Sequence, residues 1–269
     1  LLKISDKSTI WAERFDEKTA DVLHLEDVIS NRVAESLIPR LTAEERGSLA
    51  KRGTNNREAF EMYMRGRTFW NSFTSNGFAK AIESYEKAVS LDPNYAIAYA
   101  GFADNYNWLG VYGVLPPHEC FQKAKELSLK AIEIDKDLSD AHAALGFAVV
   151  AGGYDWARGE AENLRALELN PNNASAHVWY SLQLFMEGRF AEGEYHARRG
   201  AELDPLTPYN VYNIGWCLYF ARRYSDSIAH FHKTIAAFPT YPLGFYGLSW
   251  TSRIVGDYQT AIEAAQKTV

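Results

Sequence analysis

Three adjacent residues, His118, Glu119 and Cys120, have side chains of the types that bind a metal ion or form a reactive thiol site. A metal site needs further ligands at suitable spacing, and the sequence supplies none near this triplet. The triplet follows Pro116-Pro117, and proline is favoured in the first turn of a helix. We therefore interpret it as the start of a helix and predict neither a metal site nor a cofactor.

The other potentially reactive side chains also lack catalytic partners. His230 and His232 are two residues apart, so on a helix they point in different directions. Cys217 lies in an aromatic stretch, so we expect it to be a small buried hydrophobic residue. Nothing in the sequence around Cys120 requires that it be buried. The chain contains no GxSxG, phosphate-binding glycine loop or HExxH motif. We predict no catalytic residues and therefore no enzyme.

The composition is that of an ordinary soluble protein, with 47% hydrophobic residues in 269. A net charge of −6 argues against broad binding of nucleic acid or of acidic membranes. The start at Leu1 and the end at Val269, inside a helical pattern, indicate a fragment. We expect a cytoplasmic location, or a periplasmic one if the full protein has a membrane span.

Three prolines recur at equal intervals and reveal the elements that must position any site. Pro171, Pro205 and Pro239 are 34 residues apart, and each closes a similar segment. A fixed period of this size is typical of stacked helix–turn–helix units that cannot bury their apolar faces alone. The spacing therefore predicts a series of helix pairs, each ended by a proline.

Small residues recur where the two helices of a unit must approach, and Gly193, Ser227 and Ala261 share one such position. The whole pattern resembles the tetratricopeptide repeat family over residues 57–269. The resemblance implies an all-α, right-handed solenoid of antiparallel helix pairs that binds other proteins. It also places His142 and His177 at a position that the family fills with large packing residues, so we interpret both as partly buried packing histidines.

Upstream units fit the same register with insertions. Pro93 closes the first unit, and Lys136 replaces the next proline after 43 residues, so nine residues are inserted in the second unit. We expect residues 109–117 to form a long apolar loop, which either binds a partner or, as we favour, covers the ends of the second unit's helices. Residues 55–269 then contain about six units, the last one truncated.

Residues 1–54 do not fit the repeat. Residues 8–15 alternate like a strand, and an apolar helical stripe follows over residues 22–37. This segment resembles the end of a TolB-like α/β module that precedes tetratricopeptide arrays in bacterial multidomain regulators of the winged-helix, cyclase or kinase type. The resemblance implies that the chain is part of such a signalling or transcription regulator.

In each unit, positions 2, 5, 9 and 12 of the first helix lie opposite the second helix, so we expect them to line the concave surface. In the last three units these positions hold Ser175, Val178, Leu182, Phe185, Tyr209, Tyr212, Trp216, Tyr219, Leu243, Tyr246, Trp250 and Arg253. At least half of them are aromatic, against 14% of the whole chain. Upstream, the stripe continues more weakly through Tyr63, Arg67, Trp70, Asp104, Asn107, Trp108 and Phe147.

Two interpretations of this stripe remain open. In the first it is a concave groove that binds a peptide or partner surface through Leu182, Phe185, Tyr209, Tyr212, Asn213, Trp216, Tyr219, Tyr246, Trp250 and Arg253. Family members that clamp an acidic carboxylate use lysines that are missing here, so we expect an apolar or aromatic ligand. In the second the aromatic residues pack against each other, and the array is a structural spacer or a self-association segment.

Overall fold

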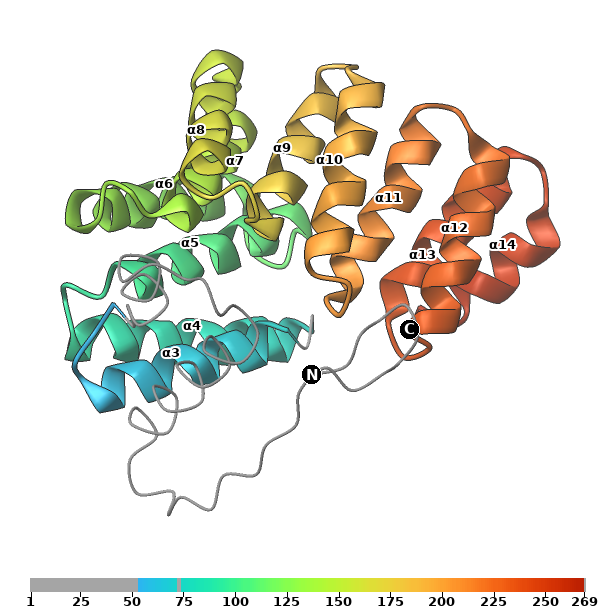
Figure 1. Ribbon diagram of the computed structural model, residues 1–269. Helices are drawn as coiled ribbons and strands as arrows, with labels where there is room; N and C mark the ends of the chain where they lie inside the picture. Colours follow the sequence, from blue (N-terminus) through green and yellow to red (C-terminus); the bar gives the residue numbers. More distant parts are fainter. Residues whose placement is uncertain (1–52, 72–73, 269) are drawn as a thin grey trace, which may run out of the picture.

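The computed structural model describes residues 53–71 and 74–268 (Figure 1), and these form twelve helices and no strand. The helices pair in chain order as α3 (Arg57–Trp70) with α4 (Ser75–Leu91), α5 (Ala96–Val111) with α6 (Pro117–Ile134), α7 (Ser139–Gly153) with α8 (Trp156–Leu169), α9 (Ala174–Met186) with α10 (Phe190–Leu203), α11 (Pro208–Phe220) with α12 (Tyr224–Ala237), and α13 (Pro242–Ile254) with α14 (Tyr258–Ala265). The predicted all-α solenoid of antiparallel helix pairs is confirmed. The predicted α/β segment falls on residues 1–54, of which 1–52 lie outside the described residues, so the domain division stays a prediction.

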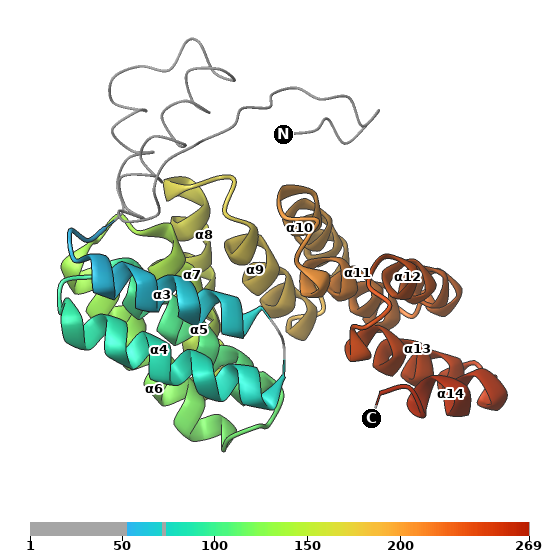
Figure 2. The same ribbon diagram turned by 90° about the horizontal axis from the view of Figure 1, so that it is seen from below.

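The helix pairs follow one another along an arch, with α3–α6 at one end and α11–α14 at the other (Figures 1 and 2). Each second helix before α14 packs both on its own partner and on the first helix of the next pair. Helices α5, α7 and α9 also contact one another directly. The array is therefore held together by contacts between neighbouring units, as expected for repeats that cannot bury their apolar faces alone. Within the described part of the chain, no helix combines the length and apolarity needed to span a bilayer.

The prolines that revealed the repeat lie directly after the second helices. Helices α8, α10 and α12 each end two residues before Pro171, Pro205 and Pro239, respectively. Proline lacks the N–H group that would continue the helix, and the residue before it avoids the helical conformation. Several helix starts are capped by a polar side chain, as in α9, where Asn173 accepts a hydrogen bond from the N–H of Ala176.

Glycine at position 8 lets the two helices of a unit approach closely. A Cβ atom added to Gly215 would lie 2.4 Å from the ring of Phe231, and one added to Gly66 would lie 2.7 Å from the ring of Tyr85. Both rings are fully buried between the helices of their units. The small residues of the register therefore make room for the large residues opposite them.

The insertion in the second unit lengthens its helices rather than forming a long loop. Helix α5 continues to Val111 and α6 begins at Pro117, so the connection spans only residues 112–116. The expectation of a loop over residues 109–117 was therefore wrong. Most of the extra residues satisfy their backbone hydrogen bonds inside the helices. Trp108 and Leu109, near the end of α5, are buried in the interior of the array.

Candidate functional site on the inner surface

The ten residues expected to form a groove divide into a buried group and a more exposed one. Phe185, Tyr209, Tyr212 and Asn213 are buried, with exposed fractions between 0 and 7%. Leu182, Trp216 and Tyr219 are partly exposed, and Tyr246, Trp250 and Arg253 are exposed. The four buried side chains are closed to a partner in this structure, so the expected groove is reduced to the other six.

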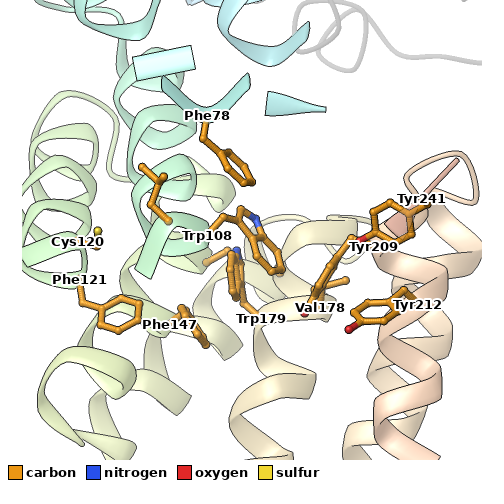
Figure 3. Close-up of a cluster of buried hydrophobic side chains, with 14 of the residues drawn as sticks. Phe78, Trp108, Cys120, Phe121, Phe147, Val178, Trp179, Tyr209, Tyr212 and Tyr241 are labelled. Carbon is orange, nitrogen blue, oxygen red and sulfur yellow. The ribbon is translucent and has the colours of Figure 1, made fainter. Parts of the chain in front are cut away.

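Tyr209, one of the four buried residues, belongs to an aromatic junction that joins units two to five (Figure 3). The ring of Trp108 in α5 lies 4.3 Å from that of Trp179 in α9 and 4.0 Å from that of Tyr209 in α11. The ring centres of Phe147 in α7 and Trp179 are 4.2 Å apart. We call these four rings the aromatic junction. Tyr209 therefore follows the second interpretation of the stripe, in which aromatic residues of different units pack against each other.

Asn213, expected to bond a peptide, is used inside the protein. Its amide donates a hydrogen bond of 2.7 Å to the hydroxyl of Ser181 in the neighbouring unit. The phenol ring of Tyr212 packs on Phe231 and Tyr241, at 5.7 and 5.9 Å between ring centres. Asn213 therefore holds adjacent units together, and Tyr212 packs within its own unit and against the start of the next, instead of facing a ligand.

The exposed group forms what we call the aromatic row, which consists of Trp216, Tyr219, Tyr246 and Trp250 with Arg253 at its end. Ring centres along the row are 5.1 Å apart for Trp216 and Tyr219, 6.1 Å for Trp216 and Tyr246, and 5.9 Å for Tyr246 and Trp250. The guanidinium of Arg253 lies 4.5 Å from the centre of the Trp250 ring, a cation–π contact. Tyr246 and Trp250 are 40% and 38% exposed, so the row offers apolar area with polar edges.

A second candidate lies at the other end of the inner surface, where units one to four together line a pocket of about 50 Å³. We call it the inner pocket. It is lined by Tyr63, Arg67 and Trp70 of α3, Tyr85 of α4, Ile97, Ala100, Gly101 and Asp104 of α5, Asp140 and Ala143 of α7, and Ser175 and Trp179 of α9. Most of these residues occupy positions 2, 5, 9 and 12 of their first helices. The register therefore predicted the correct face, but the enclosed space lies upstream of the units that the aromatic count favoured.

The inner pocket has three charged side chains between aromatic walls. The indole N–H of Trp179 donates a hydrogen bond of 2.7 Å to Asp104 Oδ1, and Arg67 Nη1 donates one of 3.2 Å to the hydroxyl of Tyr63. Asp140 lies in the first turn of α7 and has no side-chain hydrogen-bond partner within the described residues. Neither carboxylate forms an ion pair with Arg67 in that same part of the chain.

Burial dominates the ionisation of both carboxylates. It raises the pKa of Asp104 to about 7, although the hydrogen bond from Trp179 and the charge of Arg67 act to lower it. Burial likewise raises the pKa of Asp140, which Arg67 opposes. Asp104 is therefore a carboxylate whose charge the protein compensates only in part. A smaller pocket beside Asp104 and Ser175 extends this surface towards Thr207 and Asn210.

Of the residues first examined for metal or thiol chemistry, His118 and Glu119 are exposed, and the two cysteines are used for packing. Cys120 is buried, contrary to the expectation that it is free to be exposed, and burial raises its pKa. Burial also raises the pKa of Cys217, whose Sγ lies 2.9 Å from a backbone oxygen. Neither environment favours a thiolate. No group of three metal-binding side chains occurs in the part of the chain that the structure describes.

The two histidines at position 4 are buried, and their surroundings differ. His142 Nδ1 lies 2.7 Å from a carboxylate oxygen of Glu162, and this hydrogen bond raises the pKa of His142. His177 Nδ1 lies 2.8 Å from Nδ1 of His196. Burial lowers the pKa of His177, and it lowers the pKa of His196 to about 4. His177 and His196 therefore form a neutral pair between α9 and α10. His177 Nε2 donates to the backbone carbonyl of Pro171, so Nδ1 of His177 accepts and Nδ1 of His196 donates.

Sequence reasoning missed Asp140 and treated Asp104 only as part of a weak continuation of the stripe. A usable signal was present, since Asp104 holds position 9 of unit two and Asp140 position 2 of unit three. Acidic residues at two adjacent inner positions are a charge pattern that the count of aromatic residues does not detect. Small neighbours such as Ala100, Gly101 and Ala143 were the second sign of open space.

Comparisons with known proteins agree with this architecture. The sequence model of the tetratricopeptide repeat family matches residues 75–95. The transcriptional regulator HilA of Salmonella typhimurium is 25% identical over 166 residues, which cover 62% of this chain and 30% of HilA. Putative adenylate cyclase 3 of Rhizobium meliloti is 26% identical over 148 residues, covering 52% of this chain and 24% of the cyclase. The chain thus spans less than a third of each of these relatives.

Solved structures show the same fold at low sequence identity. A thermophilic tetratricopeptide protein of Thermus thermophilus aligns over 78% of this chain and 98% of its own, with 15% identity and a TM-score of 0.56. The type IV pilus biogenesis factor PilW aligns over 78% of this chain and 91% of its own, with 18% identity and a TM-score of 0.55. The Cut9–Hcn1 hetero-tetramer of the APC/C aligns over 93% of this chain and 51% of that one, with 14% identity and a TM-score of 0.57.

Proposed function

We propose that this chain, an array of tetratricopeptide repeats, binds a segment of a partner protein on its inner surface as the interaction and sensing module of a bacterial regulator. The observation that carries the proposal is the inner pocket, where Arg67, Asp104 and Asp140 lie between aromatic walls without ion pairs among the described residues. Convergent polar groups in a concave, largely apolar surface are typical of binding sites. The similarity to HilA and to a putative adenylate cyclase supports the regulatory context.

The size of the inner pocket indicates what part of a ligand enters it. A volume of about 50 Å³ is far below the roughly 300–1,000 Å³ of pockets that enclose whole small molecules. It has room for the end of one side chain. A peptide or loop that lies along the inner surface, with one residue inserted, is therefore a better fit than a free metabolite.

The aromatic row supplies the second part of the proposed surface. Rigid aromatic side chains give large contact areas at low entropic cost, and Arg253 adds hydrogen-bond donors. An apolar or aromatic segment fits the row. The fold is an interaction scaffold in which we assign no catalytic residue, and the absence of enzymatic activity stays a prediction, as do the cytoplasmic location, the lack of nucleic-acid or membrane contact and a possible homo-oligomer.

The experiment that tests the proposal selects peptides from a random dodecamer phage library with the protein as bait and measures their affinities by calorimetry. Ser175→Tyr blocks the inner pocket, and the same register position already holds a tyrosine, Tyr209, in the next unit. Trp250→Ala removes exposed area from the aromatic row. Tyr195→Ala is the control, since Tyr195 is 64% exposed on α10, which contributes nothing to the pocket.

We expect at least one inner-surface variant to weaken binding tenfold or more while Tyr195→Ala leaves it unchanged. Circular dichroism checks that each variant keeps the helical content of the wild type. Failure to select any peptide, or affinities that neither inner-surface variant changes, would contradict the proposal. In that case the alternative of a structural spacer or self-association segment, which the buried aromatic junction favours, becomes the better interpretation.

A further inference from the structure

We propose that the inner pocket binds the cationic end of a lysine or arginine side chain from the partner segment; this inference rests on the proposed function and specifies the chemistry of its ligand. The sequence instead predicted an apolar or aromatic ligand, from the residues of the aromatic row. The inner pocket differs from the row because it combines an enclosed space with two carboxylates.

Charge complementarity favours a cation over an anion. With all groups ionised, the walls carry two negative charges, on Asp104 and Asp140, and one positive charge, on Arg67. Arg67 is exposed and bonds the hydroxyl of Tyr63, whereas both carboxylates are partly buried. A ligand ammonium or guanidinium would therefore meet two opposite charges, and a ligand carboxylate would meet two like charges.

The hydrogen bonds already made leave room for the ligand's donors. Asp104 accepts from the indoles of Trp179 and Trp108, and Asp140 accepts from its own backbone N–H. An ionised carboxylate has about four lone-pair sites, so both groups retain acceptor capacity. A guanidinium or ammonium carries only donors and would use this capacity.

The aromatic walls suit the same ligand class. Trp70, Trp179, Tyr63 and Tyr85 line the pocket, and the faces of aromatic rings attract cations. The alkyl stem of a lysine or arginine would lie against these rings while its charged end reaches the carboxylates. The pocket volume of about 50 Å³ suits such an end group and excludes a bulky aromatic side chain.

The burial of the Asp104 carboxylate should make binding of a cationic side chain depend on pH. Asp104 has a raised pKa of about 7, so in the absence of a bound cation it loses its proton only near neutral pH. The titratable and charged groups that face it are Tyr63 and Arg67 from α3, Tyr85 from α4 and Asp140 from α7. The two tyrosines have raised pKa values and stay neutral below pH 10, so Asp104 and Asp140 are the groups that ionise as the pH rises.

The test uses peptides selected on the wild-type protein as described above. Each lysine of a selected peptide is replaced by norleucine, which keeps the alkyl chain without the ammonium group, and each arginine by citrulline, which keeps the shape and removes the charge. The double variant Asp104→Asn, Asp140→Asn removes the charges of the pocket, and the amide introduced at position 104 retains an oxygen that accepts from Trp179. Asp137→Asn is the control, because Asp137 is an exposed carboxylate outside the pocket.

We expect one basic residue whose neutral replacement weakens binding at least tenfold. The double variant should weaken the unmodified peptide to the same extent, and combining the two changes should cause no further loss, because both remove the same interaction. Asp137→Asn should bind like the wild type. Affinity for the basic peptide should rise between pH 5.5 and pH 8 in the wild type and stay flat in the double variant.

Other outcomes overturn the inference in distinguishable ways. If Ser175→Tyr abolishes binding but no basic residue matters, the inner surface binds a partner and the cation pocket is wrong. If an acidic residue is required instead and Arg67→Gln abolishes binding, the pocket recognises a carboxylate. If no peptide is selected, the proposed function fails together with the inference.

Discussion

The inner pocket and the aromatic row occupy the same register positions at opposite ends of one concave surface, yet they differ in shape and charge. In the pocket, Ala100, Gly101 and Ala143 leave space between charged and aromatic side chains. In the row, consecutive large rings pack side by side and leave a broad apolar surface with a single charge at Arg253. The difference shows that a repeat position determines only which face a residue lies on. The sizes of its neighbours decide whether that face is open.

The aromatic junction separates the two regions and explains why they are distinct. Its four rings, Trp108, Phe147, Trp179 and Tyr209, come from four units and fill the middle of the concave side. Trp179 also donates the hydrogen bond that holds Asp104 in the pocket. The junction thus acts as a core for the array and as one wall of the pocket, whereas most of the aromatic row remains open to solvent.

The largest expected effect tests this contrast between core and surface. Trp179→Ala removes a side chain that is 1% exposed and leaves a cavity among Trp108 and Phe147, so we expect a loss of about 3–5 kcal/mol in the free energy of unfolding. Trp250→Ala removes a ring that is 38% exposed and should cost about 1 kcal/mol or less. Urea denaturation followed by circular dichroism measures both. Equal losses would show that the row is as much a core as the junction.

Substitutions at position 8 compare the support behind the two regions. Gly215→Ala would place a Cβ 2.4 Å from the ring of Phe231, which packs on Trp216 of the row. Gly66→Ala would place a Cβ 2.7 Å from the ring of Tyr85, which lines the pocket. We expect each to lower the free energy of unfolding by roughly 1–3 kcal/mol, since an overpacked core must shift.

The matched control for this pair is Gly153→Ala, whose added Cβ would meet no atom within 4 Å. It should be neutral or slightly stabilising, because alanine favours the helix over glycine. Thermal unfolding of the three variants decides the matter. If Gly153→Ala is as damaging as the other two, close helix contact is not the reason for glycine at position 8.

The pH dependence of stability should be a property of the pocket. The raised pKa of Asp104 means that the folded state holds this proton more tightly than the unfolded state, where the pKa is near the ordinary 3.8. The resulting stabilisation is fully present below about pH 3.8 and is lost as the pH rises through about 7. The side chain introduced by Asp104→Asn cannot ionise. At pH 5 the free energy of unfolding of this variant should therefore equal that of the wild type or be slightly lower.

At pH 8 we expect Asp104→Asn to be more stable than the wild type by about 1–2 kcal/mol, since one pKa unit corresponds to about 1.4 kcal/mol and the carboxylate is only partly buried. Urea titrations at pH 5, 6.5 and 8 measure this difference. A gap between variant and wild type that does not widen with pH would show that burial leaves Asp104 at its ordinary pKa. Arg253→Gln in the row should show no such pH trend.

The smallest expected effect concerns the charged end of the row. Arg253 lies over the Trp250 ring at an exposed site, where a cation–π contact contributes about 0.5–1 kcal/mol. Arg253→Gln should lower the free energy of unfolding by no more than that amount. Raising the salt concentration should shrink the difference between the two proteins, because exposed charges are screened. A loss above about 2 kcal/mol would mean that Arg253 has a structural role.

The sequence was sufficient for the architecture because the repeat is a local pattern. Prolines after the second helices, glycines such as Gly66 and Gly215 at close contacts, and polar helix starts such as Asn173 act within one unit or between neighbours. The same register also identified the concave face. It failed at the insertion, where most of the nine extra residues lengthened α5 and α6, because helical hydrogen bonds satisfy the backbone better than a long loop does.

Local order along the chain therefore determined the helices, their pairing and the face that each side chain takes. Only the tertiary structure decided which of those side chains are buried. Trp108 and Tyr209 are 101 positions apart in the sequence, and the curvature of the array brings their rings to 4.0 Å. That curvature results from packing at every interface between units, and no single repeat contains it. The same summed curvature closes the middle of the concave side over Tyr209 and leaves the inner pocket open around Asp104 and Asp140.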